Sequence, residues 1–225
     1  MWRFGVSGIG IGACLAATLH AQGPSLSPSI RFIGNEAFEI TDGRTTILTD
    51  YPYQPGYSQY MSYDSSTVRP RGQVVVLITH GHLDHFDRSR FVNPAWRIVG
   101  PREVTRTLAP ERVIALDSVI TVGPATIRPI RTPHAGLEHY AYVVEWGALR
   151  LYFPGDTEEP ASLVAQRGLS HAFLTPWLWG RMGRQADRIP ARFIVFYHHE
   201  SGERVVGCPT CWHPRQGEEL PASFR

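Results

Sequence analysis

Residues 74–85 read VVVLITHGHLDH and join an apolar run to a cluster of polar side chains. The run Val74–Ile78 is unbroken and rich in β-branched residues, which predicts a strand buried on both faces. The residues that follow it share metal-binding chemistry: His80, His82, Asp84 and His85. Because loops at strand ends can aim several side chains at a common point, we expect a functional site here.

The spacing of these four residues suits two metal ions. Alternate residues of an extended segment point the same way, so His80 and His82 can reach one ion together. Asp84 and His85 lie just beyond, where the chain turns, and can address a second ion. Imidazole and carboxylate are good ligands for zinc and its first-row neighbours. The alternative, a polar surface loop that merely contains histidine, does not explain such a cluster at a strand end.

The composition describes a single folded domain. The 225 residues suit one domain and are too few for two ordinary ones. Hydrophobic residues make up 43% and charged residues 19%, so a sizeable core can form. The net charge is only +2 and the arginines are scattered, which leaves no basic field for nucleic acid. We therefore expect a small-molecule substrate and no nucleic-acid partner.

The first 21 residues have the pattern of a signal peptide. Arg3 is followed by the apolar, small-residue stretch Phe4–Leu19 and by a small residue, Ala21, at the expected cleavage point. The stretch is too short and too rich in glycine for a membrane span, so we expect none in the mature chain. The prediction is one mature domain over residues 22–225 that is secreted or periplasmic. A retained anchor or a lipid on Cys14 is the alternative.

The rest of the chain alternates short strands with few helices. Residues 30–33, 37–40 and 45–49 predict an antiparallel meander. Further strands are predicted at 97–99, 113–116, 119–122, 125–129, 140–145, 149–153, 172–174 and 193–197. Helices are predicted at 101–108 and 160–167. This order suits an α+β fold in which two stacked sheets are covered by helices.

Residues 79–85, THGHLDH, resemble the metal-binding signature of the metallo-β-lactamase superfamily. Three later segments resemble the family's third-histidine segment, bridging-aspartate segment and final strand with its histidine: 132–134, 153–157 and 193–199. Residues 33–38 and 48–50 resemble the opening strands of the branch that includes ascorbate-6-phosphate lactonase. The resemblance covers roughly residues 30 to 200. It implies a four-layer αβ/βα sandwich with the metals at one edge of the two sheets.

The resemblance also implies ligands for two divalent ions, zinc first, with manganese or iron as alternatives. The ligands implied for the first ion are His80, His82 and His134. Those implied for the second ion are Asp84, His85 and a late histidine, with Asp156 as a bridge between the two ions. His198 and His199 are adjacent, and the strand that runs into them favours His198 as the late ligand.

The reaction implied is hydrolysis of a lactone, an ester or a phosphodiester by a hydroxide held between two ions. Asp84 would orient that hydroxide or carry its proton in addition to binding metal, and it is the predicted catalytic residue. A mononuclear iron oxidoreductase of the sulfur dioxygenase type is a second interpretation, and a non-catalytic metal-binding protein is a third. The segment between residues 172 and 193 is short for the family and its predicted helix is weak, so the substrate stays open.

Two cysteines remain in the predicted mature chain, Cys208 and Cys211. They lie close in sequence with a proline between them, and an export signal would place them where disulfides persist. We therefore predict a disulfide that takes no part in the active site. A metal knuckle that includes His213 is the alternative, but it offers only three ligands where a structural zinc site has four.

Overall fold

The computed structural model of the protein describes Met1 and residues 27–56, 61–62, 64–200 and 202–221. Apart from Met1, the predicted signal peptide at residues 1–21 lies outside the described residues. Within the part that the structure describes, no helix is both long and apolar enough to span a membrane.

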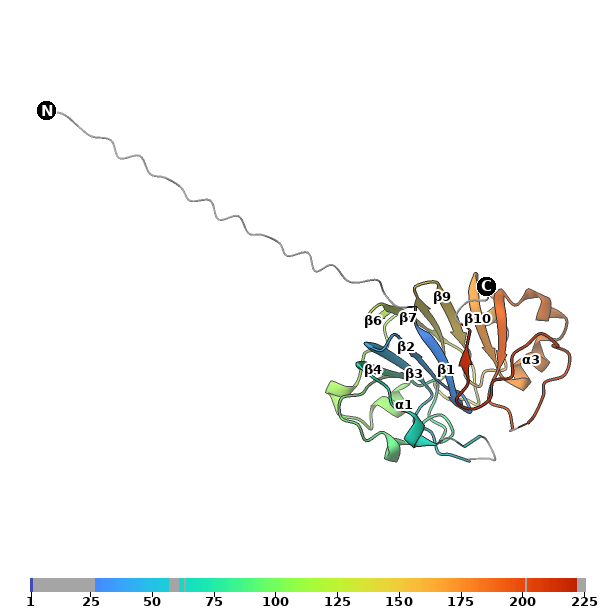
Figure 1. Ribbon diagram of the computed structural model, residues 1–225, viewed down its shortest axis with the longest axis horizontal. Helices are drawn as coiled ribbons and strands as arrows, with labels where there is room; N and C mark the ends of the chain where they lie inside the picture. Colours follow the sequence, from blue (N-terminus) through green and yellow to red (C-terminus); the bar gives the residue numbers. More distant parts are fainter. Residues whose placement is uncertain (2–26, 57–60, 63, 201, 222–225) are drawn as a thin grey trace.

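The described chain folds into two six-stranded sheets that face each other (Figure 1). The first sheet has the order β12-β1-β2-β3-β4-β5. Its strands are β1 (Ser29–Gly34), β2 (Ala37–Thr41), β3 (Thr45–Thr49), β4 (Gln73–Leu77), β5 (Arg97–Val99) and β12 (Glu219–Leu220). The first three strands pair antiparallel, as predicted, whereas β4 lies parallel to both of its neighbours.

The second sheet has the order β11-β10-β9-β8-β7-β6. Its strands are β6 (Ile120–Val122), β7 (Ala125–Arg131), β8 (Tyr140–Trp146), β9 (Leu149–Phe153), β10 (Leu169–Leu174) and β11 (Ala191–Phe196). The strands from β6 to β9 form an antiparallel meander, and β9, β10 and β11 run parallel. Parallel strands send their carboxyl ends to the same edge of a sheet, which gathers the loops that follow them.

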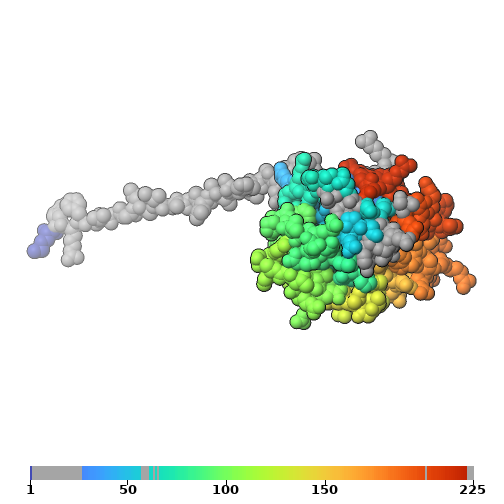
Figure 2. Space-filling model, turned by 90° about the horizontal axis from the view of Figure 1, so that it is seen from below, coloured from blue at the N-terminus to red at the C-terminus, as the bar shows by residue number. Residues whose placement is uncertain are grey.

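Short helices cover the outer faces of both sheets. They are α1 (Arg102–Thr105), α2 (Ala161–Val164) and α3 (Pro176–Met182), with 3₁₀ turns at Ser65–Thr67, Arg88–Arg90, Pro110–Arg112 and Gly183–Arg188. Val104 of α1 packs against the first sheet, and Leu163 of α2 and Leu178 of α3 pack against the second. The α+β fold with a four-layer αβ/βα sandwich is therefore confirmed. Figure 2 shows the middle of the chain and its C-terminal third on opposite sides of one face.

The alternation of side chains along β4 joins two hydrophobic clusters. Val75 and Leu77 face the core between the sheets, whereas Val74, Val76 and Ile78 face the cluster beside α1. All five side chains are buried, so the prediction of a strand buried on both faces is confirmed. A fully buried valine or leucine stabilises the fold by about 1.5–3 kcal/mol. The loop that carries the histidine cluster therefore starts from a firmly held strand.

Some predicted elements differ from those in the structure. Residues 113–116 form no strand, because Val113 makes only an isolated bridge to Ile98 directly after a 3₁₀ turn. The helix predicted at 101–108 is α-helical only over Arg102–Thr105. The helix that the sequence predicts only weakly between residues 172 and 193 is formed as α3. It begins at a defined residue, because the side chain of Thr175 accepts a hydrogen bond from the backbone N–H of Leu178.

Cys208 and Cys211 form the predicted disulfide, with their Cα atoms 5.3 Å apart. Both cysteines pack against the cluster on the outer face of the second sheet. The imidazole Nε2 of His213 accepts a hydrogen bond from the backbone N–H of Val205. The alternative metal knuckle is therefore not formed.

Candidate metal centre

The predicted ligands come from four loops, each of which directly follows a strand. The loop after β4 carries His80, His82, Asp84 and His85, while His134 follows β7, Asp156 follows β9 and His198 follows β11. The structure brings all seven of these residues together at one edge of the two sheets. The ligand loops belong to both sheets. The seven side chains therefore come together only through contacts between strands that are far apart in sequence.

The first cluster holds His80, His82, His134 and Asp156. Each offers one ligand atom, and these atoms all lie within 4.8 Å of one another. Nε2 of His80 lies 2.9 Å from Nδ1 of His82 and 3.8 Å from Oδ2 of Asp156, which lies 3.9 Å from Nε2 of His134. His82 is exposed and His134 is half-buried, so this cluster faces the solvent.

The second cluster is formed by His85, His198, Asp84 and Asp156. Nε2 of His198 lies 3.3 Å from Oδ2 of Asp84 and 3.4 Å from Oδ1 of Asp156. Nε2 of His85 lies 3.4 Å from Oδ2 of Asp156 and 3.8 Å from Oδ2 of Asp84. Asp156 therefore belongs to both clusters, in the position that the sequence predicts for a bridging ligand.

His198 and His199 turn to different surroundings although they are adjacent. His198 has a φ of 52°, a left-handed conformation that is uncommon for a residue with a side chain. Its ring enters the second cluster, whereas His199 directs Nδ1 to the carbonyl oxygen of Glu200 at 2.9 Å. The geometry thus places His198 in the cluster, and not His199.

The residues present fit a pair of bound divalent ions. Several buried polar atoms that face the centre make no hydrogen bond among the described residues: Nε2 of His85, Nε2 of His134, Oδ1 of Asp156 and both carboxylate oxygens of Glu36. A buried polar atom without a partner is costly, and a cation is the usual solution where imidazole and carboxylate atoms converge. The donor set of nitrogen and oxygen atoms suits zinc and its first-row neighbours.

Residues around His80 fix which of its ring nitrogens is free. The hydroxyl of Thr79 donates to Oδ2 of Asp50 at 3.0 Å, so its oxygen can only accept from Nδ1 of His80, also at 3.0 Å. Nδ1 of His80 therefore carries the proton, and Nε2 presents a lone pair to the first cluster. The backbone N–H of Thr79 also donates to Asp50, at 2.8 Å, which holds this carboxylate in place.

His139 holds the backbone of Asp156, the predicted bridging residue. Its Nε2 accepts the backbone N–H of Asp156 at 3.1 Å, so Nδ1 carries the proton and donates to the hydroxyl of Thr132 at 2.7 Å. Gly155 must lack a side chain, because a Cβ there would lie 2.5 Å from Nε2 of His139. His139 lies close to His134 in the sequence, but its contact with Asp156 follows only from the fold.

Glu36 is a site residue that the sequence analysis missed. It is 1% exposed, and its Oε2 lies 3.1 Å from Nδ1 of His85. A ligand atom of Glu36 also lies within 4.8 Å of those of His85, Asp156 and His198. Glu36 and Asp50 contact Nδ1 of His85, whereas the two predicted ligand carboxylates lie on its Nε2 side. We therefore place Glu36 behind the ligand ring rather than among the ligands.

Burial and mutual charge set the protonation of the acidic ligands. Burial alone would raise the pKa of Asp84, but the hydrogen bond with His198 and the charges of His85 and His198 outweigh it and lower that pKa. Burial would likewise raise the pKa of Asp156, yet the charges of His85 and His198 hold it well below its ordinary value. Both carboxyls are therefore ionised, as metal ligands must be.

His80 in the first cluster and His85 in the second have pKa values that shift in opposite directions. Burial lowers the pKa of His80 far below its usual range, so this ring stays neutral. Burial would also lower the pKa of His85, but the charges of Glu36, Asp156 and Asp50 outweigh burial and raise it well above the ordinary value. An ion that enters the second cluster must therefore displace a proton from His85.

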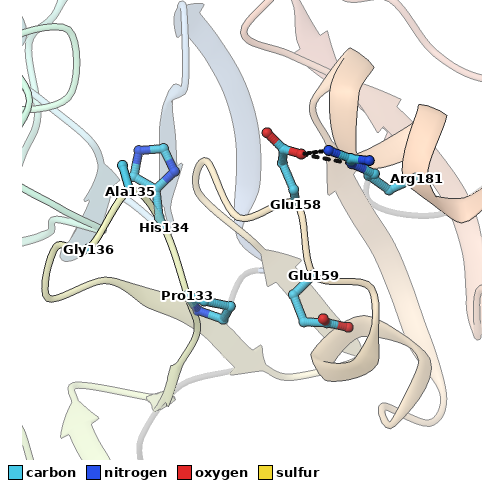
Figure 3. A pocket seen from close by; sticks show the side chains of 7 residues that line it. All are labelled: Pro133, His134, Ala135, Gly136, Glu158, Glu159 and Arg181. Carbon is cyan, nitrogen blue, oxygen red and sulfur yellow. Dashed lines mark hydrogen bonds and ion pairs between the residues drawn. The ribbon is translucent and has the colours of Figure 1, made fainter.

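A hollow of ≈ 390 Å³ opens beside the first cluster and has His134 in its wall (Figure 3). Glu158 and Arg181 face His134 across this hollow, and Nε of Arg181 donates to Oε2 of Glu158 at 2.7 Å. Both side chains of this pair are largely exposed. The hollow lets a small molecule approach the first cluster from solvent.

Solved structures share the fold at low sequence identity. A possible metal-dependent hydrolase from Veillonella parvula has a TM-score of 0.67 and 15% identity, over 87% of this chain and 99% of that one. The metallo-beta-lactamase fold protein YhfI from Bacillus subtilis has a TM-score of 0.64 and 14% identity, over 86% and 99%. CmlA, a diiron beta-hydroxylase from Streptomyces venezuelae, has a TM-score of 0.54 and 14% identity, over 76% of this chain and 45% of that one. No curated protein sequence matches the chain.

A family model adds evidence from the sequence. The model of the beta-lactamase superfamily domain matches residues 29–172, which is more than half of the chain. The matched range includes the loop after β4, His134 and Asp156, and it ends before His198. The narrower resemblance to the ascorbate-6-phosphate lactonase branch stays a prediction. Together with the fold and the clustered ligands, the match shows that the chain belongs to the metallo-β-lactamase superfamily.

Proposed function

We propose that the protein is a secreted or periplasmic hydrolase that uses two divalent ions, zinc first, to cleave a lactone, an ester or a phosphodiester. The observation that carries the proposal is the position of Asp156. Its Oδ1 faces His198, and its Oδ2 faces His85 and His80. A carboxylate placed between two ligand sets is suited to hold two ions close together, which is the arrangement of two-metal hydrolytic sites.

Two bound ions would supply Lewis acidity and lower the proton affinity of water. Asp84 is ionised and buried beside His198, so it can accept a hydrogen bond from the attacking water and take its proton. His82 and His134 hold the exposed side of the centre, where the substrate approaches through the hollow. Arg181 lies across that hollow and can orient a polar group of the substrate.

The test combines metal analysis with a panel of lactones, nitrophenyl esters and bis-nitrophenyl phosphate. We expect close to two ions per chain and turnover of one substrate class. His198→Ala should lose one ion together with the activity. His199→Ala is the matched control, because it removes the adjacent imidazole and should keep both ions. A single tightly held iron ion, with no hydrolysis across the panel, would contradict the proposal.

An iron-dependent oxidoreductase is the second candidate function. Four carboxylates lie buried at the centre, those of Glu36, Asp50, Asp84 and Asp156, and oxygen-rich surroundings suit iron and manganese. The fold likeness to CmlA, a diiron beta-hydroxylase, favours the same candidate. Metal identity in protein purified without oxygen, measured together with the substrate panel, separates the two functions: stoichiometric iron without hydrolysis favours the oxidoreductase, and zinc or manganese with hydrolysis favours the hydrolase.

The proposed location outside the cytoplasm rests on the N-terminal pattern alone. We expect the native protein to begin near Gln22, after removal of residues 1–21. Mass spectrometry of protein recovered from its native host measures this directly. A chain that retains Met1 would contradict export by cleavage, and a lipid on Cys14 would support the anchored alternative.

A further inference from the structure

The turn between β1 and β2 reaches the metal centre although it is distant in sequence from every predicted ligand. Its residues Asn35 and Glu36 are 0% and 1% exposed. The contact between Asn35 and the loop after β4 spans 49 residues of sequence. Polar side chains buried this completely need specific partners: Asn35 has a hydrogen-bond partner in the second cluster, Asp84, and Glu36 has an ion-pair partner there, His85.

Asn35 connects the two loops that carry ligands of the second cluster. Its side-chain Nδ2 donates to the backbone carbonyl oxygen of Asp84 at 2.7 Å. The backbone carbonyl oxygen of Asn35 accepts a hydrogen bond from the backbone N–H of His198 at 2.9 Å. The first loop belongs to one sheet and the second to the other, so Asn35 fixes the spacing of Asp84 and His198 across the sandwich.

Glu36 acts on the third ligand of the same cluster. Its Oε2 lies 3.1 Å from Nδ1 of His85, on the side of the ring opposite to Asp84 and Asp156. A carboxylate behind a histidine keeps the proton on Nδ1 and leaves the lone pair of Nε2 for a metal ion. The β1–β2 turn thus touches all three ligands that are unique to the second cluster.

We propose that Asn35 and Glu36 are positioning residues for the second ion: Asn35 sets the distance between Asp84 and His198, and Glu36 orients His85. This inference rests on the two-ion site of the proposed function. The first cluster, with His80, His82 and His134, makes no contact with Asn35 or Glu36 among the described interactions. The two residues should therefore act on one ion and spare the other.

Substitutions at Glu36 test the orienting contact. Zinc-loaded protein is titrated with a chelator, and the release of each zinc ion is followed. Glu36→Met keeps the bulk and removes one of the two carboxylates that face Nδ1 of His85, with Asp50 left in place. It should weaken the second zinc by about ten- to a hundredfold and leave the first unchanged. Glu36→Gln keeps an acceptor oxygen and should restore most of the affinity. Glu39→Gln is the matched control, because Glu39 on β2 pairs with Arg31 and not with the site.

An NMR measurement distinguishes a change in the orientation of His85 from a general loss of protein stability. In the zinc-loaded protein, the Nδ1 proton of His85 should give a downfield NMR signal that is protected from exchange. Glu36→Gln should shift this signal, Glu36→Met should expose it to exchange, and Glu39→Gln should leave it in place. A mere loss of packing would not move the signal in this order.

Asn35 needs a pair of variants because its φ is 50°. Asn35→Gly removes the side-chain donor and tolerates that conformation, whereas Asn35→Ala adds backbone strain. We expect both variants to weaken the second zinc, with Asn35→Ala also less resistant to urea. Wild-type protein that binds only one zinc would overturn the two-ion site itself. Two zinc ions that are both unaffected in Glu36→Met and Asn35→Gly would overturn the positioning role alone.

Discussion

The two halves of the metal centre are buried to different depths. In the first half, His82 is exposed and His134 is half-buried beside the hollow. In the second half, His85 and His198 are 0% and 1% exposed. The second half is also backed by Glu36 and Asp50, whereas the first opens towards solvent. Under the proposed two-ion function, this difference predicts that the ion of the first half meets the substrate and that the ion of the second half is held by the fold.

Removal of metal should give the largest effect and tests this difference directly. With gradual addition of a chelator, we expect the ion of the first half to leave first and activity to fall to background with it. The ion of the second half should need more chelator, because water reaches its ligands poorly. Metal content and turnover measured on the same samples check the order. Simultaneous loss of both ions would show that the two halves of the centre hold their ions equally firmly.

Asp84→Asn should give the next largest effect. The amide keeps the shape of the side chain but cannot take a proton, so turnover should fall on the order of a hundredfold or more. Metal content should fall far less, since His85, His198 and Asp156 remain. Kinetics and elemental analysis of the variant measure both quantities. Near-normal turnover would remove Asp84 from the mechanism and leave it as a ligand only.

Acidification should test the aspartate that the two halves share, because His139 accepts the backbone N–H of Asp156 and has a lowered pKa. Burial, together with the charge of His134, lowers the pKa of His139 to about 3, against about 6.5 in an unfolded chain. Between these values the unfolded chain binds the proton and the folded chain does not. Stability should therefore fall as the pH falls through this window, by up to about 1.4 kcal/mol per pH unit from this residue.

Urea unfolding of metal-free protein between about pH 6 and pH 4 measures that slope. His139→Gln should unfold more easily at every pH, because it loses the support of Asp156, but its slope should be shallower. Metal-free protein is needed because protons also compete with metal for the other rings. An unchanged slope in His139→Gln would show that its protonation is not linked to folding.

The disulfide should give the smallest effect, because it lies outside both halves of the centre. The loop that Cys208 and Cys211 close is short, so it removes little chain entropy. Cys208→Ser should lower the free energy of unfolding by no more than about 1–2 kcal/mol and leave both ions bound. Thiol titration of unfolded, unreduced protein should find no free thiol in the mature chain. Loss of an ion in Cys208→Ser would contradict this prediction and show that metal binding depends on the C-terminal segment.

The residue pattern alone predicted the local part of the site, whereas the ligands His134, Asp156 and His198 were predicted through the family resemblance. The first four ligands lie together in the chain: His80, His82, Asp84 and His85. The buried strand before them sets their direction, so the motif can be recognised without knowledge of the fold. Glu36 and Asn35 were missed because their partners lie far away in sequence, and a polar turn between two strands has the same pattern wherever it packs. Their burial was the missing information. The start of α3 had a local signal, Thr175 followed by Pro176, that was not used.

The errors in the fold have the same origin. Residues 113–116 have the β-branched composition of a strand, but only Val113 finds a bridge partner at the edge beside β5. β12 is a two-residue strand whose pairing with β1 depends on where the C-terminal segment returns. Short elements of this kind are made by tertiary contacts and carry little pattern of their own.

The described chain has four residues other than glycine with positive φ: Asn35, Asp50, Ala135 and His198. Each is a member of the centre or adjoins one, since Ala135 follows His134 and Asp50 contacts His85. Left-handed backbone costs a residue with a side chain on the order of 1–2 kcal/mol. Buried hydrogen bonds offset that cost at two of these positions: Asn35 donates to the carbonyl oxygen of Asp84, and Asp50 accepts from Thr79. The described residues that hold left-handed backbone against a side chain therefore gather around the metal centre, where surrounding contacts must hold each in place.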